Sequence, residues 1–211
     1  MSTNYAQLER AWLCDAMLDV GPDAPTLCEG WSVADLAAHL VVRENRPDAA
    51  LGILAAPFAN YGDKVRKAYA RKPFEELVQK VRSGPPMVSP TRLGAIDKLA
   101  NTIEFFVHHE DVRRAQSDVA PRELQGEEVD QLWTALNRMA KMMTRKAPSG
   151  MTLVAPGDRE LVAHGGEPMV TIRGEVGELV LFVYGRQRSA DIELDGPSGA
   201  CDALMEASFG I

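Results

Sequence analysis

The chain has 211 residues, enough for one large domain or two small ones with a core that needs no disulfide for stability. Its 23 Lys and Arg residues against 30 Asp and Glu residues give a net charge of −7, which argues against a nucleic-acid backbone or an anionic membrane as the principal partner. Hydrophobic residues make up 45% and charged residues 25%, the composition of an ordinary globular protein rather than a disordered or membrane-embedded one.

The cysteines and the N-terminal residues indicate the cellular compartment of the protein. Cys14, Cys28 and Cys201 are an odd number without CxxC spacing, which favours free thiols in a reducing compartment. The first residues lack the basic-then-apolar layout of a secretory signal, and the apolar stretches fall short of the roughly 20 residues that cross a bilayer. We therefore expect a cytoplasmic protein with no membrane partner.

The first two thirds of the chain have the hydrophobic pattern of helices. Ser32 is a predicted N-cap, with Asp35 placed to complete a capping box and Trp31 and Leu36 at the two positions of a hydrophobic staple. Several amphipathic helices, each burying one stripe and joined by loops, favour a helical bundle. The apolar spacing predicts these helices at about 4–20, 33–45, 59–83 with a break near Pro73, 93–115 and 127–145.

The character of the sequence changes after Ala147. Short β-type runs separated by Pro and Gly turn signals predict a small sheet. Residues 178–184 are ambiguous between a strand and a buried helix, with a slight preference for a helix, and residues 198–207 are predicted to be helical. We therefore expect a mainly α protein, with a four-helix bundle over residues 1–147 followed by a small α+β domain over residues 148–211.

The four histidines include one pair with metal-ligand spacing. Glu104 and His108 lie one helical turn apart on one face, so a carboxylate oxygen and an imidazole nitrogen can converge. His39 supplies a third ligand if its helix packs beside theirs. Two imidazoles and one carboxylate are a known set for catalytic Zn²⁺ with an open position, and bundle interiors commonly hold such sites.

A structural explanation of the same residues stays open. Helical Glu/His pairs at this spacing are common solvated contacts worth a few tenths of a kcal/mol. His109 points about 100° away from His108 on a helix, so we expect it at the surface or behind the ligands. His164, beside two glycines, is expected in an exposed turn.

Residues 27–40, LCEGWSVADLAAHL, resemble the C-x-G-W-[ST]-V-x-D-x-x-x-H-L signature of the mycothiol-dependent maleylpyruvate isomerase family, which is part of the wider DinB/YfiT-like metal-binding bundles. The Glu104-x-x-x-His108 turn followed by Asp111 is similar to the second metal motif of that family, and residues 170–186 resemble its small C-terminal domain, which is similar to sterol-carrier proteins. The chain looks most similar to the metal-binding branch rather than to the isomerases proper. The resemblance implies that His39, Glu104 and His108 are ligands of Zn²⁺ or another divalent metal.

The resemblance also implies a reaction. A thiol such as mycothiol, activated on the metal, would attack a small electrophile, so that the protein is an isomerase or a thiol S-transferase. An anionic substrate or thiol needs cations nearby, and Arg43 and Arg186 are candidates, with plain surface solvation as the alternative. The expected partners are a small-molecule thiol and an electrophile, with no nucleic acid, and the protein is expected to be a monomer or homodimer. Two further hypotheses are a hydrolase that uses zinc-bound water and a non-catalytic metal- or ligand-binding protein.

Overall fold

The computed structural model describes residues 3–46, 48–49, 59–85, 95–117, 119–124 and 126–209. Contacts between Cα atoms divide the chain into two compact units, Met1–Ala120 and Pro121–Ile211. The first unit is helical and the second combines helices with one small sheet, so the predicted mainly α fold with a small α+β part is confirmed. Among the described residues, no helix has both the length and the apolar character required to span a membrane.

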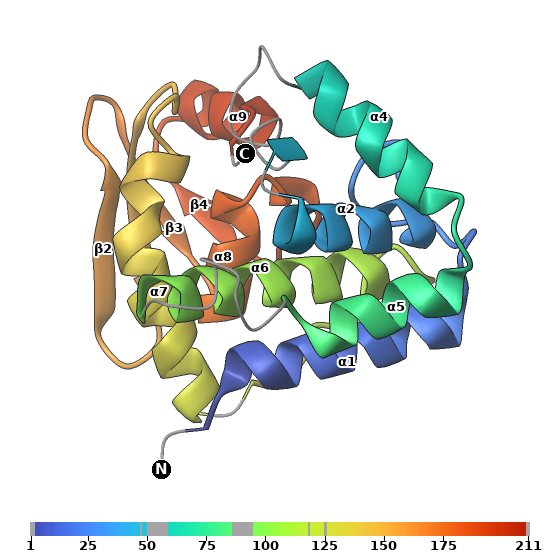
Figure 1. Cartoon of the computed structure of the whole chain (residues 1–211). Coiled ribbons are helices and arrows are strands. Elements are labelled where there is room, and N and C mark those ends of the chain that lie inside the picture. The colour runs from blue at the N-terminus through green and yellow to red at the C-terminus, as the bar shows by residue number, and fades with distance from the viewer. Residues whose placement is uncertain are drawn as a thin grey trace. The chain divides into compact units, whose positions relative to one another are not determined.

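The helices of the first unit pack alongside one another. Helix α1 lies against α6 and α5, and α2 lies against α4 and α5 (Figure 1). The break predicted near Pro73 separates α4 from α5, because proline has no backbone N–H to continue a helix and instead suits the start of one. The first residues of the predicted 93–115 helix lie outside the described residues. The elements are α1 (Tyr5–Val20), α2 (Val33–Asn45), α4 (Ala59–Ala70), α5 (Phe74–Ser83) and α6 (Ala95–Arg113).

Helix α2 begins where the sequence predicts it. The Ser32 side chain accepts from the backbone N–H of Asp35 at 3.4 Å, and the Asp35 carboxylate accepts from the backbone N–H of Ser32 at 3.2 Å. This capping box satisfies backbone donors that a helix start leaves without partners. The apolar side of α2 then packs into a core shared with α1, α5 and α6, whose largest buried members are Leu13, Met17, Leu36, Leu40, Leu77 and Phe105.

The second unit is built on a four-stranded sheet with the order β2-β1-β3-β4. Strand β1 is antiparallel to β2 and parallel to β3, and β3 is antiparallel to β4. Helix α8 is buried on every side, which explains why its sequence resembles a strand: a run that is apolar apart from Glu178 has no helical period to read. The elements are α7 (Gly126–Met143), β1 (Gly150–Ala155), β2 (Arg159–His164), β3 (Met169–Arg173), α8 (Val176–Val183), the 3₁₀ turn η3 (Gln187–Ser189), β4 (Glu193–Asp195) and α9 (Ser198–Glu206).

The two units divide earlier in the chain than the boundary expected near Pro148. Helix α7, which the hydrophobic pattern assigned to the bundle, contacts α8 and β2 in the second unit. Thr144, just beyond α7, donates to the carbonyl of Ala163 in β2 at 2.9 Å, and Arg159 pairs with Asp130 of α7 at 2.6 Å. A helical period shows which face of a helix is buried but not which partner covers it. The assignment of residues 1–147 and 148–211 as domains stays a prediction.

Candidate metal centre

Three predicted ligands from two helices converge in the first unit. His39 comes from the middle of α2, and Glu104 and His108 come from successive turns of α6. Glu104 Oε1 lies 3.4 Å from His108 Nε2 and 3.7 Å from His39 Nε2. One ligand atom from each of the three residues lies within 4.8 Å of those from the other two. The structure therefore brings together the residues that the sequence singles out, and each can offer a metal one donor atom.

The three side chains are neither fully buried nor freely solvated. Their exposed fractions are 11% for His39, 20% for Glu104 and 12% for His108. The two imidazole rings meet edge to face, with centroids 5.5 Å apart. The ring of Trp31 lies on His39, with the centroids 5.1 Å apart and the planes tilted by 50°. The cluster thus packs against the ring of Trp31, and each of the three side chains keeps a small part of its surface exposed to solvent.

Asp111 holds His108 from the side away from Glu104. Its carboxylate Oδ2 lies 2.9 Å from His108 Nδ1, and the Asp111 side chain is completely buried. The same oxygen accepts from the thiol of Cys28 at 3.2 Å, and the Asp111 backbone carbonyl accepts from the N–H of Leu27 at 3.0 Å. Cys28, His108 and Asp111 form a second group whose possible ligand atoms lie within 4.8 Å of one another.

The sequence indicates the position of Asp111 but not its contacts with Cys28. The spacing of three residues from His108 places both on neighbouring turns of one helix face. Nothing local in the sequence shows that the loop before α2 reaches the end of α6. Cys28 therefore joins the surroundings of a candidate ligand through a contact between residues far apart in the chain.

Burial and hydrogen bonding act against each other on the three candidate ligands. Burial alone would raise the pKa of Glu104, but hydrogen bonds with His108 and His39 and the charge of Arg43 hold that pKa well below its usual value. Burial alone would lower the pKa of His108, but hydrogen bonds with Asp111, Cys28 and Glu104 raise that pKa well above its usual value. The pKa of His39 is lowered, because burial outweighs its hydrogen bond with Glu104. The cluster is thus one carboxylate, one neutral imidazole and one imidazole that favours its protonated form.

The two predicted cations lie in different units. Arg43 Nε lies 3.2 Å from Glu104 Oε1, and Arg43 Nη1 donates to Asn101 Oδ1 at 3.0 Å, so Arg43 borders the cluster as its position one turn beyond His39 predicts. Arg186 belongs to the second unit, where its Nη1 donates to the carbonyl of Tyr184 at 2.5 Å. A role of either arginine toward an anionic substrate stays a prediction.

Of the two remaining histidines, the sequence predicts His109 at the surface or behind the ligands, and His164 in an exposed turn. His109 is not at the surface, since it is buried and its Nδ1 lies 2.8 Å from Glu9 Oε2 in α1. The expectation of an exposed turn is wrong for His164, which ends strand β2, is half-buried and is in register with Met151 of β1. The error for His164 arises because the two glycines that signal a turn follow this residue, which still pairs with β1.

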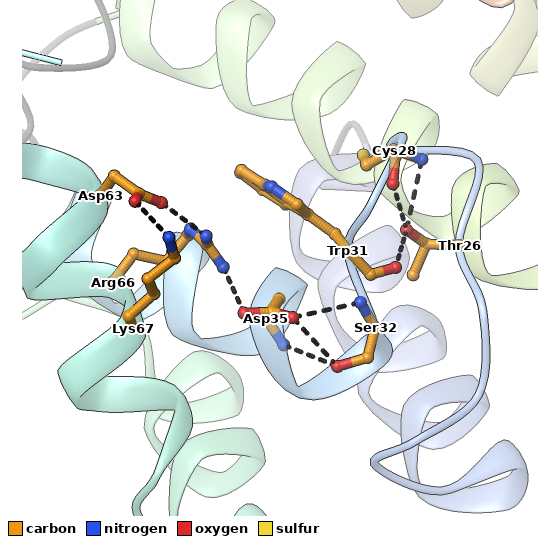
Figure 2. A network of polar contacts seen from close by, with 8 residues as sticks. All are labelled: Thr26, Cys28, Trp31, Ser32, Asp35, Asp63, Arg66 and Lys67. Carbon is orange, nitrogen blue, oxygen red and sulfur yellow. Dashed lines mark hydrogen bonds and ion pairs between the residues drawn. The ribbon is translucent and has the colours of Figure 1, made fainter. Parts of the chain in front are cut away.

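The loop before α2 and helix α4 meet at Trp31, whose ring packs on His39. Thr26 Oγ1 accepts from the N–H of Cys28 at 3.2 Å and donates to the carbonyl of Trp31 at 2.9 Å, so one hydroxyl group closes the turn that carries both side chains. Arg66 of α4 lies over the ring of Trp31, with its Cζ 4.6 Å from the centroid. Figure 2 shows the loop and α4 contributing to one polar network.

Comparison with known proteins identifies the family. Residues 9–167 match the model of the family described as "Mycothiol maleylpyruvate isomerase N-terminal domain". The chain belongs to this family. Its matched region contains Trp31, His39, Glu104, His108 and Asp111, and it crosses both the division at residue 120 and the expected boundary near residue 148.

Solved structures of a member of the isomerase family share the fold. A crystal structure of a histidine-to-alanine mutant of the mycothiol-dependent maleylpyruvate isomerase is 15% identical, with a TM-score of 0.58 over 92% of this chain and 91% of that one. A second crystal structure of the mycothiol-dependent maleylpyruvate isomerase is 14% identical, with a TM-score of 0.52 and the same coverage. No curated protein matches the chain. The chain is thus homologous to an enzyme and, at this level of identity, the structural likeness is one of fold.

Proposed function

We propose that this chain is a metal-dependent member of the isomerase family, which binds Zn²⁺ or a similar divalent cation through His39, Glu104 and His108. The observation that carries the proposal is the convergence of these three donor atoms, from two helices, within 4.8 Å of one another. The reaction that we propose is mycothiol-dependent isomerisation of a small electrophile or transfer of the thiol to it. Family membership supports the thiol and the isomerase class.

The donor set suits zinc by its chemistry. Two imidazole nitrogens and one carboxylate oxygen are a common ligand set of catalytic zinc, which keeps a further position for substrate. The partial exposure of the three side chains is consistent with a small molecule reaching that position. When bound there, Zn²⁺ would favour the thiolate form of a thiol, which is the nucleophilic form.

The surrounding residues prepare the donors in different ways. The Asp111 carboxylate fixes the ring of His108, so that Nε2 faces Glu104. Burial keeps His39 neutral by lowering its pKa, which leaves a ring nitrogen able to donate electrons to a cation. The carboxylate of Glu104 stays ionised because the neighbouring imidazoles and Arg43 hold its pKa well below the usual value, against the effect of burial.

Arg43 is our candidate for binding an anionic group of the substrate or of the thiol. Its side chain is 24% exposed beside Glu104, and a guanidinium matches a carboxylate in a planar, two-bond geometry. Arg186 is a second candidate, from the turn that follows α8. An Arg43→Lys variant would keep the charge and lose the planar geometry, so we expect it to raise KM for an anionic substrate more than it lowers kcat.

Elemental analysis tests the metal site directly. Purified wild-type protein is compared with a Glu104→Ala, His108→Ala double variant and with a His164→Ala control, whose histidine belongs to strand β2. We expect the wild type and the control to hold the metal in equal amounts and the double variant to lose it while retaining the helical circular dichroism spectrum. Equal metal in the double variant would overturn the site.

A second assay separates the reaction classes. Metal-loaded wild-type protein and a His39→Ala variant are incubated with mycothiol and with maleylpyruvate or another small electrophile. Turnover that needs both the thiol and His39 supports the proposal. Ester or amide hydrolysis without thiol indicates the hydrolase hypothesis, and zinc binding without any turnover indicates a non-catalytic binding protein.

A further inference from the structure

The ring of Trp31 lies between a cation from α4 and a candidate ligand from α2. The Arg66 guanidinium carbon is 4.6 Å from the Trp31 centroid, and the His39 centroid is 5.1 Å from it. In Figure 2 the Trp31 indole extends from the loop before α2 towards the part of α4 that carries Arg66. A continuous series of contacts therefore leads from α4 through Trp31 to His39, and from there to the ring of His108.

The guanidinium of Arg66 is fixed in place by two carboxylates. Its Nη1 bonds to Asp35 Oδ1, and its Nη2 bonds to Asp63 Oδ1 at 2.6 Å. Arg66 is only 7% exposed, and a cation over an aromatic ring is more stabilising when it is shielded from water. Because Asp35 also caps α2, this pairing joins α4 to the start of the helix that carries His39.

The rings of the two candidate histidine ligands are held by different means. His108 has the carboxylate of Asp111 on its Nδ1. The His39 ring is in contact with two other rings, those of Trp31 and His108. A metal ligand needs a fixed ring orientation, and packing against Trp31 supplies this to His39 in the way that a hydrogen bond supplies it to His108.

We propose that Arg66 is a positioning residue of the metal centre: it holds Trp31 against His39, so that the docking of α4 sets the orientation of the His39 ring and with it the affinity for the metal. Arg66 touches neither metal nor substrate and acts through the indole. This role rests on the proposed function, since it needs a metal bound by His39.

The test measures the zinc dissociation constant by competition with a chromophoric chelator. Arg66→Met keeps the approximate length of the side chain and removes its charge and its planar guanidinium group. We expect it to weaken zinc binding about tenfold, the lower end of the effect measured for residues that support a metal ligand. Arg66→Lys keeps a cation and is expected to restore part of the loss. The matched control is Lys67→Met on the same helix, because Lys67 pairs with the same Asp63 at 2.7 Å but is 62% exposed, and it should leave the affinity unchanged.

A double-mutant cycle shows whether Arg66 acts through Trp31. In a Trp31→Leu background the ring that transmits the effect is gone, so Arg66→Met should cause no further loss of zinc affinity. A remaining tenfold loss in that background, or wild-type affinity of a folded Arg66→Met protein, would overturn the role of Arg66 and leave the proposed function intact. Failure of the wild type to bind zinc would instead overturn the proposed function. Should Arg66→Met not fold, Arg66→Lys and Trp31→Phe carry the same comparison.

Discussion

At the scale of single residues, neighbouring side chains contact and hold the candidate ligands. Asp111 is completely buried and places one carboxylate oxygen within hydrogen-bond distance of both His108 Nδ1 and Cys28 Sγ. Arg43 shares an oxygen of Glu104 with the two histidines. Each of these contacts changes how strongly a candidate ligand holds its proton, and therefore how readily it gives a lone pair to a metal.

Replacing Asp111 by asparagine tests the support of His108. The amide keeps the volume and loses the charge, so the ring of His108 is held less firmly and becomes a weaker donor. We expect zinc affinity to fall by about 10-fold to 100-fold, measured by chelator competition, with the melting temperature recorded as a check on the fold. A Cys28→Ser variant keeps a donor to Asp111 and should bind zinc nearly as well as the wild type. Unchanged affinity in Asp111→Asn would contradict a supporting role.

The pH dependence of zinc binding follows from the directions of the pKa shifts. The pKa of His108 is raised well above its usual value by Asp111, Cys28 and Glu104, against burial, so a proton competes with the metal there. The pKa of His39 is lowered by burial, so His39 adds little competition. We expect the apparent zinc affinity to fall as the pH is lowered, by about tenfold per pH unit where one proton is displaced, starting above the usual pKa of about 6.5.

The same shift makes an opposite prediction for stability without metal. A group whose pKa is raised in the folded state stabilises it below the unfolded pKa, and this contribution is lost as the pH rises through the folded pKa. His108 therefore favours the folded metal-free protein at lower pH, where its affinity for zinc is weakest. Urea unfolding of the protein in a chelator, from about pH 6 to about pH 9, measures this contribution apart from that of Glu104, whose lowered pKa changes the stability only at acidic pH. A zinc affinity that does not change with pH would contradict the assignment of His108.

At the scale of elements, the start of α2 determines where His39 lies. The capping box of Ser32 and Asp35 fixes the first turn, and His39 follows two turns later on the side towards α6. The spacing of Glu104 and His108 is a property of one helix and could be predicted from sequence. The partner that each helix side receives depends on residues far away in the chain, which is why the stacking of Arg66 on Trp31 could not be predicted.

Removing the cap of α2 should cost stability. Ser32→Ala leaves the backbone N–H of Asp35 without its side-chain acceptor, and we expect the free energy of unfolding to fall by about 1 kcal/mol. Urea denaturation measures the change. Ser83→Ala is the matched control, because that exposed hydroxyl group donates to the Gln79 carbonyl at the end of α5 and its loss should be close to neutral. An equal effect of the two substitutions would contradict the importance of the cap.

The buried pair of Glu9 and His109 links α1 to α6. Glu9 is completely buried, and its Oε2 lies 2.8 Å from His109 Nδ1. Glu9→Ala would leave the imidazole without this partner, so we expect a loss of about 3 kcal/mol in the free energy of unfolding by urea. His109→Leu in the same background removes the group left behind and should recover part of the loss. A Glu9→Ala loss no larger than that of Lys67→Met would contradict this role of the pair.

At the scale of the whole molecule, all three candidate ligands lie in the first unit. Sequence patterns predicted both the helical and the sheet-containing regions, because hydrophobic period, capping residues and turn residues are local signals. The pattern placed α7 with the bundle; in the structure α7 contacts α8 and β2, and the domain boundaries stay a prediction. The ambiguity of residues 178–184 has a different origin, since a segment buried on every side has no polar face to mark a helical period.

A destabilising substitution in the second unit tests whether the stability of that unit affects metal binding in the first. A Cβ atom at Gly150 would collide with the backbone carbonyl of Gly166. The atom it meets belongs to the backbone, which cannot move aside as the end of a flexible side chain can. We expect Gly150→Ala to destabilise the second unit by about 1–3 kcal/mol, seen as a lower melting temperature. Zinc content should stay at the wild-type level at temperatures below the transition. Gly199→Ala, where a Cβ meets open space, serves as the control.

The two hydrogen bonds received by Asp111 also assign the tautomer of His108. An ionised carboxylate can only accept, so Nδ1 keeps its proton and the lone pair of the neutral ring lies on Nε2, the atom that faces Glu104. One ring nitrogen, Nε2, can therefore donate electrons, while the other, Nδ1, anchors the ring to Asp111. Because Cys28 donates to the same oxygen, the loop before α2 and the candidate ligand His108 near the end of α6 are joined through Oδ2 of Asp111. We therefore expect substitutions that remove the hydrogen-bond donor at Cys28 to change the electron-donating strength of His108.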